Sequence, residues 1–169
     1  VTVYGTNLSD GVAKAEALPL PDQLNNTQLL LGDRSLPLFY TSAGQANAQV
    51  PFDLTPNTQH QIVVRRGSSL SVPQTLSVAE AQPGIFALNQ QGTGQGIILK
   101  SDQRTVAAPG TPANVGEAIV IYCTGLGLVT PAVSEGKPVP ELPLSPTVKP
   151  VTVTIGGKNA TVLFSGLTR

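Results

Sequence analysis

His60 is the side chain in this sequence best suited to acid–base chemistry, because it is the only histidine and imidazole titrates near neutral pH. With Asp53 and one of the many serines it could form a nucleophile–base pair. No Gly-x-Ser-x-Gly motif accompanies it, however. His60 stands between Gln59 and Gln61 at the start of a strand-like segment. We therefore expect an exposed or hydrogen-bonded histidine, and a protein that is not an enzyme.

Residues 92–96 read Gly-Thr-Gly-Gln-Gly and superficially resemble a phosphate-binding loop. Such loops hold phosphate with a Lys-Ser/Thr pair and with the N-terminus of the helix that follows. This segment has neither the pair nor a helical pattern after it. We therefore expect a flexible loop before a strand, and no nucleotide cofactor.

Metal and thiol chemistry are also restricted by the residue types present. Cys123 is the only cysteine, which excludes an intrachain disulfide, and with His60 alone it cannot make a zinc site of several Cys and His ligands. The apolar neighbours of Cys123 predict a buried, unreactive thiol. The aspartates lack the spacing of a calcium loop; they are Asp10, Asp22, Asp33, Asp53 and Asp102. We expect no bound metal and no cofactor.

The composition favours a chain of strands and turns. Hydrophobic residues make up 40% of the 169 and charged residues 12%, and 17 glycines with 15 prolines are too many for a helical protein. Lys+Arg and Asp+Glu number 10 each, so no net field attracts nucleic acid. No apolar run reaches the ~20 residues that span a bilayer. We expect neither a nucleic-acid partner nor a membrane span.

The sequence also contains an internal repeat. A repeat indicates how many structural units a chain has, so it restricts the possible folds more strongly than a short motif does. Three pairs of segments match in the same order: residues 4–8 with 122–126, residues 18–20 with 142–144, and residues 29–40 with 153–164. The last pair aligns without gaps. We therefore expect two related units.

The tyrosines are the residues most suited to stacking against sugar rings. Tyr4 and Tyr122 occupy equivalent positions of the repeat, which favours a shared packing role, and Tyr40 is the third. The sequence has no tryptophan. Three triplets fit the N-glycosylation pattern, and turn formation is the simpler interpretation of each; they begin at Asn7, Asn25 and Asn159.

Residues 45–52 give the clearest strand pattern. Ala46, Ala48, Val50 and Phe52 alternate with polar residues and a proline, so one face of the strand is apolar.

Two hairpins are predicted in the same half, one over residues 29–40 with its turn at 32–35, the other over residues 61–78. Residues 10–18 permit a turn or two of helix but fit a loop equally well.

The second half repeats parts of this pattern. We expect a hairpin insertion near residues 96–107, a strand over 117–124, and a hairpin of 151–155 with 161–164. The domain boundary is predicted at residues 81–84, which gives units 1–82 and 83–169. The predicted class is all-β, with two tandem immunoglobulin-like β-sandwich units.

Several short segments of the sequence resemble segments of known protein families. The sequence resembles an IPT/TIG-type immunoglobulin-like domain at residues 3–8, in the apolar segment that ends at Gly32, and at residues 38–40 and 49–51. Nearly the whole chain resembles an uncharacterised domain at the C-terminal ends of large secreted acidobacterial proteins, through the phrases at residues 40–51, 83–86, 121–127 and 150–157. This resemblance implies a secreted or cell-surface location.

Both the repeat and the resemblance imply about three further strands after residue 169, the counterpart of residues 45–78. The second unit would otherwise expose apolar surface and unpaired backbone. The gap could be filled by further residues of the same chain, by the hairpin at 96–107, or by a strand from a neighbouring subunit.

We therefore expect a structural or interaction module that works with other domains of a longer chain. One alternative is a carbohydrate or cell-envelope binding domain, which would bind a surface glycan through an exposed platform of aromatic side chains. The other is a self-assembling fibre subunit whose copies join through open sheet edges.

Overall fold

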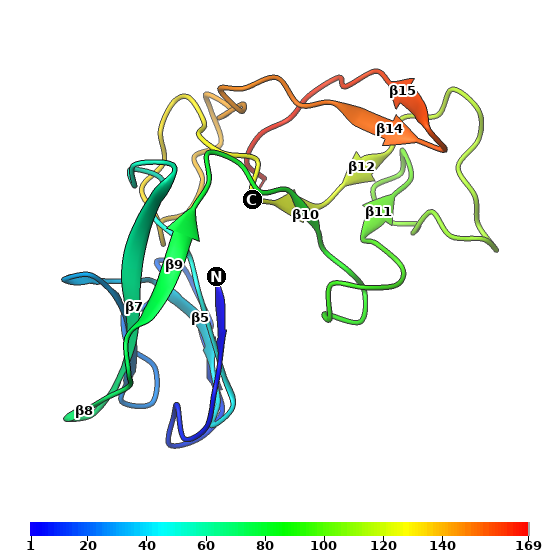
Figure 1. The fold of residues 1–169 in the computed structure, drawn as a ribbon. Helices are drawn as coiled ribbons and strands as arrows, with labels where there is room; N and C mark the ends of the chain where they lie inside the picture. The colour runs from blue at the N-terminus through cyan, green and yellow to red at the C-terminus, as the bar shows by residue number, and fades with distance from the viewer. Residues whose placement is uncertain (169) are drawn as a thin grey trace. The chain divides into compact units, whose positions relative to one another are not determined.

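The computed structural model describes residues 1–168, and every regular element in this range is a β-strand (Figure 1). The strands pair antiparallel throughout. The all-β class is therefore confirmed. By its internal contacts the chain divides into two compact units, one made of Val1–Glu80 with the residues from Leu128 onward, the other of Ala81–Gly127.

Residues 1–80 form two antiparallel sheets. The first contains, in spatial order, β1 (Thr2–Tyr4), β6 (Gln45–Ala48), β5 (Leu38–Thr41) and β2 (Ala13–Lys14). The second contains β4 (Arg34–Ser35), β3 (Thr27–Leu31) and β7 (Thr58–Arg66), and β7 pairs with β8 (Ser69–Leu70) near one end and with β9 (Gln74–Val78) along the rest.

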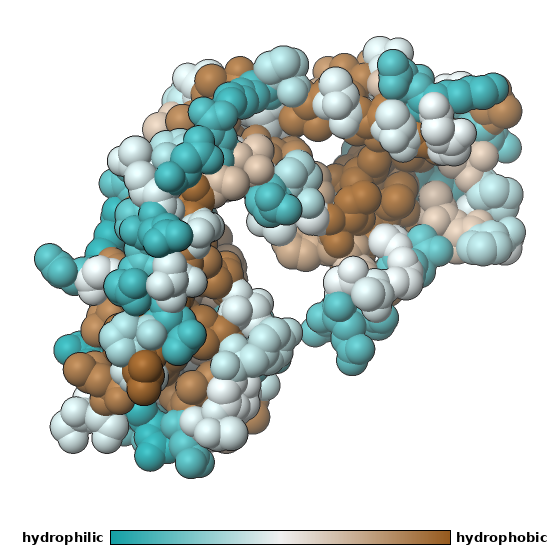
Figure 2. Space-filling model, in the orientation of Figure 1, coloured by the Kyte–Doolittle hydropathy of each residue, from teal (hydrophilic) through white to brown (hydrophobic). Residues whose placement is uncertain are grey.

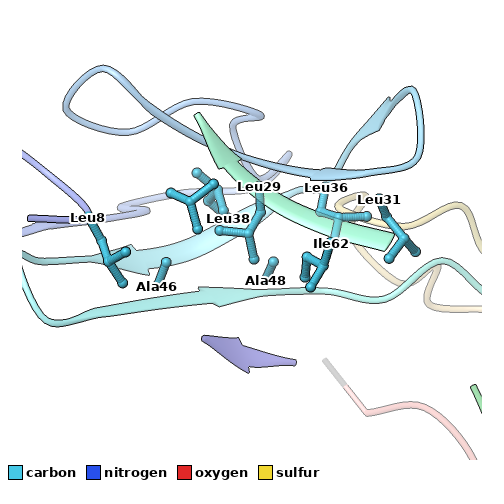
Figure 3. Close-up of a cluster of buried hydrophobic side chains, with 9 residues drawn as sticks. Leu8, Leu29, Leu31, Leu36, Leu38, Ala46, Ala48 and Ile62 are labelled. Carbon is cyan, nitrogen blue, oxygen red and sulfur yellow. The ribbon is translucent and has the colours of Figure 1, made fainter. Parts of the chain in front are cut away.

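One apolar core lies between these two sheets. Figure 3 shows Leu29 and Ile62 of the second sheet directed toward Leu38 and Ala46 of the first. Leu29, Leu38 and Ala46 are each 0% exposed. Alternate residues of β3 are buried, as the period of a half-buried strand requires. Two sheets closed over a shared core make residues 1–80 a β-sandwich.

The turn after β3 is tighter than the sequence suggested. Leu31 pairs with Arg34, so the hairpin turn contains only Gly32 and Asp33. Gly32 has φ +60, a conformation that glycine adopts without strain. The predicted single hairpin over 29–40 is wrong in its second arm, because β5 belongs to the opposite sheet. Pro37, which has no N–H to donate to a ladder, lies where the chain changes sheets.

The strand predicted at residues 45–52 is shorter in the structure. β6 ends at Ala48, and Ala46 and Ala48 are buried as the alternation required. Beyond β6 the pattern breaks down, because Pro51 is buried while Val50 and Phe52 are only half-buried. Residues 10–18 contain the short strand β2 and no helix.

The unit Ala81–Gly127 contains four two-residue strands in two pairs. β10 (Gly84–Ile85) pairs with β13 (Cys123–Thr124), and β11 (Ile98–Leu99) pairs with β12 (Val120–Ile121). In the region where a hairpin insertion was expected, 96–107, the amide of Lys100 donates to the carbonyl of Thr105 at 2.8 Å and Leu99 bridges Val106.

Residues 128–168 contain one hairpin, of β14 (Val153–Ile155) and β15 (Lys158–Ala160). Its turn, Gly156-Gly157, has φ +57 at the position equivalent to Gly32, so the internal repeat preserves the turn. The second arm lies at 158–160, earlier than the predicted 161–164.

Gly136 attaches this part of the chain to the first sandwich. Its carbonyl accepts a hydrogen bond from the amide of Leu20 at 2.7 Å, and its own amide donates to Oε1 of Gln49 at 2.7 Å. Arg34 pairs with both Asp53 and Glu135. The residues from Leu128 onward therefore group with residues 1–80, whereas the sequence repeat had placed them with 83–127. The tandem immunoglobulin-like arrangement stays a prediction.

Candidate binding face

The solvent-facing side of the sheet β1-β6-β5-β2 carries an unusual set of side chains, which we call the outer face: Thr2, Tyr4, Lys14, Phe39, Tyr40, Gln45 and Asn47. Successive strand residues point to opposite sides of a sheet. Val3, Ala46 and Thr41 point inward and are half-buried or buried. Their strand neighbours therefore face solvent.

A register shift in β5 adds an aromatic residue to this face. Leu38 pairs with Ala48, but the next pair is Tyr40 with Asn47, so Phe39 is an extra residue on β5. An unpaired extra residue of this kind is a β-bulge. Because Leu38 remains buried and Phe39 is 48% exposed, the bulge places Phe39 next to Tyr40 at the surface.

The strand register places the remaining members of the outer face in two rows. Tyr4 lies opposite Gln45 in one row. In the other, Asn47 lies between Thr2 and Tyr40, and Tyr40 lies opposite Lys14. Residues directly opposite one another have Cβ atoms about 5 Å apart, so the side chains of each row are in contact range.

The side chains of Gln45 and Asn47 are joined by a hydrogen bond. Nε2 of Gln45 donates a hydrogen bond to Oδ1 of Asn47 at 2.8 Å. Among the described residues, the amide nitrogen of Asn47 and the amide oxygen of Gln45 have no side-chain or backbone partner. The pair therefore keeps a free donor group on Asn47 and a free acceptor group on Gln45 for solvent or for a ligand.

Tyr4 does not have the packing role that its repeat position suggested. It is 75% exposed, which makes it one of the most exposed large side chains of the first sandwich. Its repeat partner Tyr122 is only half-buried. Tyr4 was considered as a sugar-stacking residue from the sequence, but Phe39 was missed. Gln45 and Asn47 were missed as well. For these two residues the sequence did carry a signal, because polar and small residues alternate at 45–48 and this alternation assigns Gln45 and Asn47 to one face of the strand.

A second kind of surface is found outside the first eighty residues. Ile85, Phe86 and Leu88 are each about half exposed in the unit Ala81–Gly127, and Figure 2 shows hydrophobic residues gathered at the surface over β11 and β12. In the part from Leu128 onward, Leu163 is 81% and Phe164 52% exposed. An open groove of about 460 Å³ lies there between residues 146–151 and 162–165.

The residues that the sequence suggested for catalysis have other partners. Nε2 of His60 lies 2.8 Å from Oγ1 of Thr58 in β7, the hydrogen-bonded role expected for it. Asp53 instead pairs with Arg34 at 2.7 Å. The structure therefore assigns these two groups to separate local contacts.

The carboxylates of Asp102 and Glu117 stabilise turns in the unit Ala81–Gly127. The hydroxyl of Thr105 and the amides of Thr105 and Arg104 donate to Asp102, which lowers its pKa to about 2. The amide of Asn114 and the hydroxyl of Ser101 likewise lower the pKa of Glu117 to about 2. Hydrogen bonds to a charged carboxylate favour its ionised form.

Cys123 lies in β13 opposite Ile85 and is half-buried, so the expected full burial is wrong. Partial burial nevertheless raises the pKa of its thiol, because the thiolate is poorly solvated.

The glycine-rich segment 92–96 is a loop, as expected, with φ +71 at Gly92 and +82 at Gly94. Within residues 1–168, no three Asp, Glu, His or Cys side chains come together as metal ligands would.

The chain shows no match to known proteins. No family model, curated protein or solved structure matches it. No described segment forms a helix long and apolar enough to cross a membrane.

Proposed function

We propose that this chain is a non-catalytic structural or interaction module of a secreted or cell-surface bacterial protein, built from immunoglobulin-like units. The observation that carries the proposal is the outer face. The exposed rings of Tyr4 and Phe39, the half-buried ring of Tyr40 and a hydrogen-bonded amide pair are presented by a sandwich whose apolar core is buried behind them. Exposed aromatic residues on a rigid scaffold are typical of a recognition surface.

The scaffold supports this function because the side chains on the outer face and the side chains that form the core are different residues. Inward residues of β5 and β6 are 0–3% exposed and form the core, whereas Asn47 and Tyr4 make no part of it. Binding can therefore occur without disturbing the folded state. The proposed extracellular location is supported by the resemblance to a domain of secreted acidobacterial proteins.

The proposal is tested by binding to insoluble bacterial cell-envelope material. The purified chain is mixed with washed envelope, sedimented, and quantified in the pellet. We expect retention of the wild type, reduced retention of Tyr4→Ala, and wild-type retention of Val72→Ala. Val72 is also 75% exposed but lies between β8 and β9 of the other sheet, so it is a matched control. Equal retention of both variants would contradict an interaction role for the outer face.

A second candidate function, self-assembly, is favoured by the part of the chain from Leu128 onward. The segments that flank β14 and β15 are joined by hydrogen bonds at Thr147 and Ser165, while Leu163 and Phe164 between them remain exposed. Exposed apolar residues beside short strands are sites at which another chain can add a strand. Sedimentation velocity from low to high protein concentration would show growth in mass that Leu163→Ser weakens; a constant monomer mass would contradict self-assembly.

A further inference from the structure

The outer face has the chemistry to bind one particular class of ligand. We propose that it binds a neutral, extended polysaccharide whose rings carry equatorial hydroxyls, of the β-1,4-glucan type. This inference rests on the proposed interaction function and specifies the ligand of the same surface.

The charge of the outer face selects against ionic partners. Lys14 is the only charged residue among its seven members, and the others are three aromatic residues, two amides and one threonine. Nucleic acid and anionic lipid require clusters of Lys or Arg, which one lysine does not provide. Neutral amides and exposed rings are complementary to a ligand that is uncharged, hydroxyl-rich and apolar on its ring faces.

The amide pair has the arrangement that sugar hydroxyls require. A hydroxyl group both donates and accepts a hydrogen bond. The amide nitrogen of Asn47 and the amide oxygen of Gln45 are free, and they belong to two neighbouring side chains that are joined by a hydrogen bond of 2.8 Å. Two neighbouring hydroxyls of one ring can therefore be bound together, one by the donor and one by the acceptor. Both groups are only partly buried, so water occupies these positions without a ligand, at little energetic cost.

The aromatic residues stand on either side of this pair. Tyr4 is on β1, Phe39 and Tyr40 are on β5, and Gln45 and Asn47 are on β6 between them. From a strand spacing of ~4.8 Å and a rise of ~3.4 Å per residue, the Cα atoms of Tyr4 and Tyr40 are about 12 Å apart. Rings at this separation stack on different sugars of one extended chain, while the amides bind the hydroxyls between them.

Phosphoric-acid-swollen cellulose and cellohexaose are the probes that test this proposal. Retention on swollen cellulose is measured by sedimentation, and cellohexaose affinity by calorimetry, with the full 169-residue chain. We expect the wild type to bind both, Tyr4→Ala to weaken binding at least tenfold, and Asn47→Ala at least fivefold. Val72→Ala should bind as the wild type does. Circular dichroism and thermal melting of each variant show that the fold is retained.

The possible failures are distinguishable. No binding to either probe, or binding that neither Tyr4→Ala nor Asn47→Ala weakens, overturns the polysaccharide proposal. Binding to heparin in place of swollen cellulose also overturns it, because a charged ligand would then be preferred. If Tyr4→Ala reduces retention on cell-envelope material while neither glucan binds, the interaction function stands and the ligand class is wrong. A dimer that dissociates on Tyr4→Ala would show a second copy to be the occupant.

Discussion

Gly136 provides a sharp test of how the residues from Leu128 onward are held against the first sandwich. Its backbone has φ +72, and a Cβ atom added there would lie 3.0 Å from Cβ and 3.1 Å from Cγ of Pro37. Gly136→Ala therefore introduces both an unfavourable backbone conformation and a contact that Pro37, a rigid ring, cannot relieve by rotation. The hydrogen bonds to Leu20 and Gln49 are weakened as the loop moves away.

The expected magnitude follows from these two effects. A non-glycine residue in the left-handed region is destabilised by about 1–2 kcal/mol, and the contact with Pro37 increases this. A loss of about 2 kcal/mol in the free energy of loop opening corresponds to about a 30-fold change in the opening equilibrium. The amide of Leu20, which donates to the carbonyl of Gly136, reports this opening directly.

Hydrogen exchange of the Leu20 amide is the assay. We expect it to exchange about 30-fold faster in Gly136→Ala than in the wild type. Gly110→Ala is the matched control, because a Cβ at Gly110 meets nothing within 4 Å and its φ is not in the left-handed region. Gln49→Leu removes the acceptor of the Gly136 amide, and a net hydrogen-bond contribution of about 1 kcal/mol predicts about fivefold faster exchange of that amide. Leu20 exchange within twofold of the wild type in Gly136→Ala would refute the attachment.

Three further outcomes are expected. Leu29→Ala should lower the free energy of unfolding, measured in urea, by about 2–5 kcal/mol because Leu29 is 0% exposed. The control Leu70→Ala should change it by less than about 0.5 kcal/mol because Leu70 is 64% exposed. Similar losses in both variants would argue against the two-sheet core. The pKa of Glu117, about 2, lies below that of an unfolded glutamate, so its contribution to stability is present at neutral pH and is lost as pH falls below about 4 toward 2. Carbon NMR titration of Glu117 measures this directly, and a pKa near 4 would contradict the hydrogen bonds from Asn114 and Ser101. Because burial raises the pKa of Cys123, its thiol should react with a disulfide reagent at pH 8 more slowly than free cysteine and equally fast in urea; full reactivity in the folded protein would show an accessible thiolate.

The strands of the first sandwich were predictable where alternation was strong. Residues 45–48 alternate small and polar side chains, and the structure buries Ala46 and Ala48 as that pattern requires. The glycines after residues 31 and 155 predicted turns at both places, and both have positive φ. Local chemistry determines these features, so a single sequence is sufficient to find them.

Features that depend on contacts distant in sequence were not predictable in the same way. The bulge at Phe39 arises from the register between β5 and β6, and register depends on which partner strand is present. The attachment of Gly136 to Leu20 and Gln49 joins residues about a hundred positions apart. The similarity between the two repeats predicted that the chain divides into two related units. It carried no information on the contacts that join residues from different repeats.

The candidate site was predictable only in part for the same reason. Tyr4 could be considered from its residue type, but its position beside Gln45 is a matter of strand pairing. Nothing in the residues next to Phe39 marks it as exposed. The outer face becomes visible only when four strands, separated by loops of different length, are placed side by side.

The closed core beneath the outer face has a consequence for how this surface can diversify. Positions 2, 4, 45 and 47 alternate with the residues that stabilise the fold, so replacing them changes surface chemistry without opening a cavity. Randomising those four codons should therefore yield a library in which most members still fold. Related chains could acquire new ligands at these positions, one substitution at a time, while keeping the same scaffold.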